Sequence, residues 1–126
     1  MKPELLAVIR RMYDNEATDA RLYAMLAEHT KSDNNRAVLL KIASDEEKHE
    51  AIWGKFLDGP PKVNTFKVRL FAFLAKIFGL VFVINLMEAG EDKAIAAYTE
   101  LSRDLPVAKE VLEDESRHEA QLVSLL

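Results

Sequence analysis

Asp45 to Ala51 reads DEEKHEA, and Asp114 to Ala120 reads DESRHEA. The two heptapeptides differ only at their third and fourth positions, and the fourth residue is basic in both. Each contains Glu-x-x-His, a spacing that puts a carboxylate and an imidazole on one face of an α-helix. The duplication therefore predicts two matching helices that present the same chemical groups.

The sequence around both heptapeptides has an apolar stripe at helical spacing, in alternating steps of three and four. One stripe contains Leu39, Ile42, Glu46, His49, Trp53 and Phe56, and the other contains Ala108, Val111, Glu115, His118, Leu122 and Leu125. Two more stripes have the same form: Val81, Ile84, Glu88, Glu91, Ile95 and Tyr98; and Ile9, Met12, Glu16, Asp19, Tyr23 and Leu26. All four stripes are apolar towards their ends and acidic near the middle.

The stripes predict an all-α protein with four main helices, over about 3–30, 32–57, 80–103 and 107–126. Ser32 or Asp33 is expected to cap the second helix, and Asn64 or Thr65 a further helical segment. The sequence DGPP from Asp58 marks a break. We expect residues 1–126 to form one domain, because this length can bury a sizeable core. The apolar end, VSLL, is typical of a domain cut from a longer chain, and equally of a frayed natural terminus.

The apolar segment Leu70–Met87 has three interpretations. It is borderline long enough for a membrane span, which would leave the bundle one helix short. It is also suitable as a crossover that connects the second and third main helices. Such a crossover would be an apolar and basic outer element, which packs on a second subunit or on an anionic membrane surface. The third interpretation is one continuous helix from Asn64 to Arg103. We favour the crossover, with a homodimer.

The acidic residues in the stripes indicate bound cations. A buried carboxylate without a positive partner is very costly, and no Lys or Arg lies on any stripe. Five stripe glutamates nearly balance two divalent cations: Glu16, Glu46, Glu88, Glu91 and Glu115. The chain has no cysteine, which excludes thiolate ligands and disulfides. Carboxylate and imidazole ligands suit iron or manganese, and zinc less exclusively.

This arrangement resembles the rubrerythrin branch of the ferritin-like superfamily, in its erythrin form. The resemblance implies a ferritin-like four-helix bundle with a crossover between helices 2 and 3, and two iron ions that are oxo-bridged when oxidised. Glu46 and Glu115 would bridge the metals, and His49 and His118 would each bind one of them. Glu16 and Glu88 would be terminal ligands, and Glu91 would shift with the redox state. Tyr23 and Tyr98, two turns along their stripes, would hydrogen-bond a ligand or donate electrons.

The implied activity is Fe(II) oxidation by hydrogen peroxide or dioxygen, of the ferroxidase or peroxidase type, with an external electron donor because no rubredoxin module is present. Two alternatives stay open: an iron-sensing or iron-delivery domain of a membrane transporter of the vacuolar iron transporter class, and a hydroxylase of a lipid-soluble substrate. We expect the protein to be cytoplasmic, and the membrane alternatives would put it at the cytoplasmic face of a membrane. A net charge of −4 argues against nucleic acid as a partner.

Overall fold

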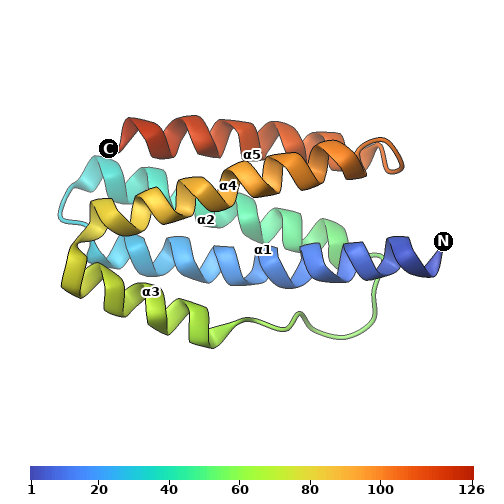
Figure 1. Ribbon diagram of the computed structural model, residues 1–126, viewed down its shortest axis with the longest axis horizontal. Coiled ribbons are helices and arrows are strands. Elements are labelled where there is room, and N and C mark those ends of the chain that lie inside the picture. The colour runs from blue at the N-terminus through green and yellow to red at the C-terminus, as the bar shows by residue number, and fades with distance from the viewer. The chain divides into compact units, whose positions relative to one another are not determined.

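The chain is built from helices alone. The computed structural model describes residues 1–126 and contains no strand (Figure 1). The helices are α1 (Pro3–His29), α2 (Asp33–Gly54), α3 (Thr65–Phe78), α4 (Leu80–Leu101) and α5 (Val107–Ser124). They belong to two compact units, Met1–Phe73 and Leu74–Leu126. The predicted all-α class is confirmed. None of the helices has the length and apolar character that crossing a membrane requires.

In the first unit, α1 and α2 pack along each other as an antiparallel hairpin (Figure 1). The short connection ends at Ser32, whose side chain accepts a hydrogen bond of 3.2 Å from the backbone N–H of Asn35. Ser32 is therefore the N-cap of α2, one of the two residues predicted for that position. Most of the large apolar side chains buried on the two helices lie on the predicted stripes: Ile9, Tyr23, Leu26, Leu39, Ile42 and Trp53. Leu22 is also buried although it lies outside the predicted stripe, and Phe56, the last residue of the second stripe, is 37% exposed.

The linker 55–64 runs from the end of α2 to the start of α3 and is held on α1. The backbone N–H of Lys62 donates to Asp14 Oδ1 at 2.9 Å, and that of Asn64 donates to Thr18 Oγ1 at 3.0 Å. These bonds satisfy backbone donors that a strand or helix would otherwise satisfy. They fix the linker on the first unit although it has no regular secondary structure.

Helix α3 begins after Asn64, whose side chain accepts a hydrogen bond of 3.0 Å from the backbone N–H of Lys67. This confirms Asn64 as a cap. The helix ends at Phe78 because Gly79 has φ +92°, a left-handed conformation that residues with a side chain rarely adopt. The interpretation of one continuous helix from Asn64 to Arg103 is therefore wrong.

In the second unit, α4 and α5 form another antiparallel pair (Figure 1). The buried residues of α5 match its predicted stripe from Ala108 to Leu122. On α4, Met87 is buried where the stripe predicted Glu88, and Val81 is exposed. Both Met87 and Glu88 fit a step of three or four from Ile84. The apolar methionine occupies the buried position because burying it costs no desolvation of charge.

Candidate metal-binding clusters

The first cluster lies between α1 and α2. Glu16 of α1 is 3% exposed, and Glu46 and His49 of α2 are 0% and 1% exposed. A hydrogen bond of 3.3 Å joins His49 Nδ1 to Glu16 Oε2, and His49 Nδ1 lies 3.8 Å from Glu46 Oε1. The close packing of the two helices therefore brings two carboxylates from different helices to one imidazole nitrogen.

The second cluster lies between α4 and α5 and repeats this arrangement. Glu91 of α4 and Glu115 and His118 of α5 are all at most 3% exposed. His118 Nδ1 lies 3.8 Å from Glu115 Oε2 and 4.0 Å from Glu91 Oε1. In both clusters the Glu-x-x-His pair of one helix meets a single glutamate of its antiparallel neighbour. In both, the nitrogen that faces the carboxylates is Nδ1.

Each cluster fits one divalent cation. Ligand atoms bound to one metal at about 2.1 Å lie roughly 3 to 4 Å from each other, depending on the angle between them. The separations between His Nδ1 and the carboxylate oxygens, 3.3 and 3.8 Å in the first cluster and 3.8 and 4.0 Å in the second, fall in this range. Within each cluster, one ligand atom per residue can be chosen so that all lie within 4.8 Å of one another. With both glutamates ionised and the imidazole neutral, each cluster has a charge of −2.

Glu88 lies in a different group from the other predicted ligands. It is half-buried, and its carboxylate oxygens come within 4.8 Å of those of Asp92 and Glu119. A hydrogen bond between the carboxyl groups of Glu119 and Asp92 raises the pKa of Glu119, and partial loss of hydration and the charges of Asp92 and Glu88 act in the same direction. Asp92 and Glu119 are not among the ligands predicted from the sequence. Two features of the sequence could have identified this group. Glu88 and Asp92 are four residues apart and so share one face of their helix, and Glu119 directly follows the predicted ligand His118.

The two candidate tyrosines are buried, and the aspartates that precede the two Glu-x-x-His motifs are paired. Tyr23 is fully buried and Tyr98 is 1% exposed, each on the helix that provides the single glutamate of its cluster. Asp45, which precedes Glu46, is buried and accepts a hydrogen bond of 2.6 Å from Lys41 Nζ. Asp114, which precedes Glu115, forms an ion pair with Arg117.

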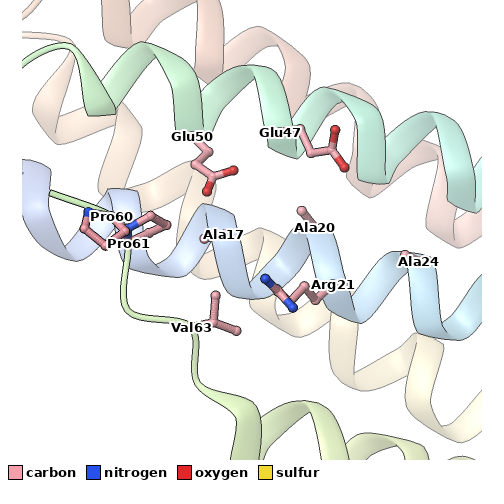
Figure 2. Close-up of a pocket in the computed structure, with 9 residues that line it drawn as sticks. All are labelled: Ala17, Ala20, Arg21, Ala24, Glu47, Glu50, Pro60, Pro61 and Val63. Atoms are coloured by element: carbon pink, nitrogen blue, oxygen red, sulfur yellow. The ribbon is translucent and has the colours of Figure 1, made fainter.

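A cavity of about 470 Å³ lies beside α1 and α2, next to the linker (Figure 2). Alanines of α1, the two prolines of the linker and Val63 line its apolar part, and Arg21, Glu47 and Glu50 line its polar part. Burial raises the pKa of the Glu50 carboxyl, the charge of Glu47 adds to this, and the Arg21 guanidinium opposes it. Glu47 and Glu50 directly follow Glu46 and His49, so the two faces of DEEKHEA have different surroundings.

Comparisons of the chain with protein-family models, with curated proteins and with solved structures found no match.

Proposed function

We propose that this chain binds two metal ions, one at each Glu-Glu-His cluster, and uses iron in redox chemistry of the ferroxidase or peroxidase type. The observation that carries the proposal is the duplicated cluster, in which two buried carboxylates from different helices converge on one imidazole nitrogen. A single buried pair of this kind could be an ordinary hydrogen-bonded core group. Two copies with the same ligand atoms favour a site built for a pair of cations.

The donor atoms favour iron or manganese over softer metals. All six ligands are carboxylate oxygens or imidazole nitrogens, and the chain contains neither cysteine nor a disulfide. Such hard and intermediate donors suit iron, manganese and zinc, of which only the first two have accessible redox states. Manganese and zinc are therefore expected to compete with iron for the clusters.

The ferritin-like four-helix bundle, with α3 as its crossover, is part of this proposal. Its support is the sequence pattern, since each of the four long helices has an apolar stripe with an acidic residue near the middle. In such a bundle the two clusters are the halves of one dinuclear centre. An external electron donor completes the proposal, because residues 1–126 contain no cysteine for a redox module of the rubredoxin type. We also propose a homodimer.

When bound, two Fe(II) ions supply the two electrons that convert one hydrogen peroxide and two protons into two water molecules. The residues of the chain hold and shield the ions. The glutamates offset the positive charge, and each histidine provides one neutral nitrogen. Burial of the clusters limits access of bulk water. Glu91 is the ligand proposed to shift between oxidation states, and Tyr23 and Tyr98 are proposed to hydrogen-bond ligands or to donate electrons.

The test is anaerobic loading with Fe(II) followed by stoichiometric peroxide in one sample and oxygen in another. The proposal predicts complete oxidation of two Fe(II) per chain and a new near-ultraviolet absorption of coupled Fe(III). An iron-sensing or delivery domain would bind the ions but oxidise them no faster than free Fe(II). Oxidation at that uncatalysed rate, in Glu115→Gln and in the unmodified chain alike, would contradict the redox proposal while leaving metal binding intact.

A further inference from the structure

Helix α3 exposes a continuous apolar stripe. None of its residues is buried, although most are apolar. Phe66, Leu70, Phe73 and Ile77 are 73%, 38%, 59% and 59% exposed. Steps of four, three and four put these four side chains on one face of the helix. A soluble chain rarely leaves such a face uncovered unless it binds something.

The exposure continues after Gly79 into the first turns of α4. Phe78, Val81, Phe82 and Leu86 are each at least 37% exposed, and the rings of Phe78 and Phe82 lie 5.0 Å apart. Phe78 is the last residue of α3, and the other three residues belong to the start of α4. The surface that needs a partner therefore includes the start of α4.

The apolar stripe of α3 is bordered by cations. Arg69 and Lys76 are exposed on one side of it, and Lys67 lies on the other, with Nζ 5.6 Å from the centre of the Phe71 ring. Residues 59–87 contain four basic residues and no acidic one. This segment therefore has a charge of +4. Because the whole chain has a net charge of −4, the residues outside the segment have a net charge of −8. The basic charge is thus concentrated on the same segment as the exposed apolar side chains.

Charge and length together identify the partner. Symmetric pairing of α3 with a second α3 would bring the same cations together, which is unfavourable. Fourteen residues of α-helix measure about 21 Å, too short to cross a hydrocarbon core of about 30 Å. An apolar stripe bordered by Lys and Arg is suited to lie in the plane of an anionic bilayer, with its rings below the headgroups.

We propose that α3 docks on the surface of an anionic lipid membrane. Phe66, Phe73 and Ile77 enter the boundary between headgroups and acyl chains, and Lys67, Arg69 and Lys76 contact the lipid phosphates. Long basic side chains can extend to the headgroups while their aliphatic parts cover apolar surface. This docking does not depend on metal binding, because none of these residues belongs to either cluster.

The chain has no cysteine, so a single introduced cysteine can report on one position. Phe73→Cys and Ser116→Cys, both at exposed positions, are labelled with an environment-sensitive dye. The probe is a set of phosphatidylcholine vesicles with or without about 25% phosphatidylglycerol. Dye emission at residue 73 is expected to shift to the blue with anionic vesicles only, and emission at residue 116 to stay constant.

Vesicle sedimentation tests the role of charge. Lys67→Gln, Arg69→Gln and Lys76→Gln together are expected to weaken binding to anionic vesicles roughly a hundredfold, since each cation contributes about fivefold. Lys2→Gln, Lys31→Gln and Lys109→Gln together remove the same charge from exposed positions elsewhere and are expected to leave binding nearly unchanged. Equal losses in both triple variants would contradict docking by α3.

Two further results would overturn the proposal. One is equal binding to neutral and anionic vesicles, or to neither. The other is a blue shift at residue 73 that grows with protein concentration without vesicles, together with a dimer in sedimentation equilibrium, which would assign the surface to a second copy of the chain.

Discussion

His49 Nδ1 lies 3.3 Å from Oε2 of Glu16, a residue 33 positions earlier in the chain. His118 Nδ1 and Glu91 Oε1 have the same relationship across α4 and α5, at 4.0 Å. In each case the antiparallel packing of two helices brings together groups that the sequence keeps apart. This shared geometry underlies the proposal that each helix pair holds one metal ion.

Glu115→Gln is expected to weaken metal binding by more than about tenfold, because an amide oxygen provides no negative charge to the ion. Isothermal titration with Mn²⁺ measures the change without oxidation of the metal. Glu113→Gln is the matched control, since Glu113 lies on the same helix but is exposed. Equal affinity in the two variants would show that Glu115 is not a ligand.

Glu46→Gln is expected to change stability in opposite directions with and without metal. Glu46 is 0% exposed, so in the metal-free chain its charge is costly, and the amide should stabilise the fold by on the order of 1 kcal/mol. With metal at about a hundredfold above the dissociation constant, each occupied cluster should add about 2.7 kcal/mol to the stability of the unmodified chain. The variant should lose most of the gain from its own cluster and keep the gain from the Glu91, Glu115 and His118 cluster.

Urea unfolding in the presence of a chelator, and again with Mn²⁺, measures both effects of Glu46→Gln. Glu47→Gln removes the same charge from the neighbouring exposed position and should leave the metal-dependent gain intact. If Glu46→Gln keeps the full gain, the cluster is a structural group of the core and not a metal site.

The raised pKa of Glu50 predicts a pH-dependent stability difference in the metal-free chain. The folded state binds this proton more tightly than the unfolded state, so ionisation costs stability. Relative to Glu50→Gln, the unmodified chain should therefore be equally stable below pH 4.5 and should lose stability as the pH rises through the raised value. Solvent screening keeps the loss below about 0.5 kcal/mol. Thermal unfolding from acidic to neutral pH measures it, and a difference that grows towards low pH would contradict the assignment.

Gly79→Ala and Gly90→Ala separate backbone conformation from packing. An added Cβ meets nothing within 4 Å at either position, but Gly79 has φ +92° whereas Gly90 lies within α4. Alanine at position 79 should cost about 1–2 kcal/mol, and alanine at position 90 should stabilise α4 by about 0.5–1 kcal/mol. Denaturant unfolding of the metal-free variants measures both. Similar effects at the two positions would mean that the break between α3 and α4 does not require glycine.

The sequence predicted the buried face of α5 best. On α5, the alternation of three-residue and four-residue steps predicts Val111, Glu115 and His118, and all three are buried. On α4, Ile84 can be followed by Met87 or by Glu88 at equally good spacing. Only the packing of α4 on α5 decides between them, and it buries the methionine.

Features that depend on non-periodic segments could not be predicted. The bonds that hold the linker on α1 involve Asp14 and Thr18, two ordinary polar residues of a helix that no pattern marks. The cavity beside Glu50 exists because the linker passes there (Figure 2). Helical spacing determines which face of one helix is apolar, but it contains no information on the path of an irregular segment.

The most direct test of the central claim is the number of metal ions bound per chain in three histidine variants, measured by anaerobic Fe(II) titration. The account predicts two ions for the unmodified chain and one each for His49→Ala and His118→Ala. His29→Ala is the control and should bind two, because His29 is exposed and its Nδ1 lies 2.9 Å from the backbone oxygen of Met25. Two ions in all three variants, or none in the unmodified chain, would contradict the account.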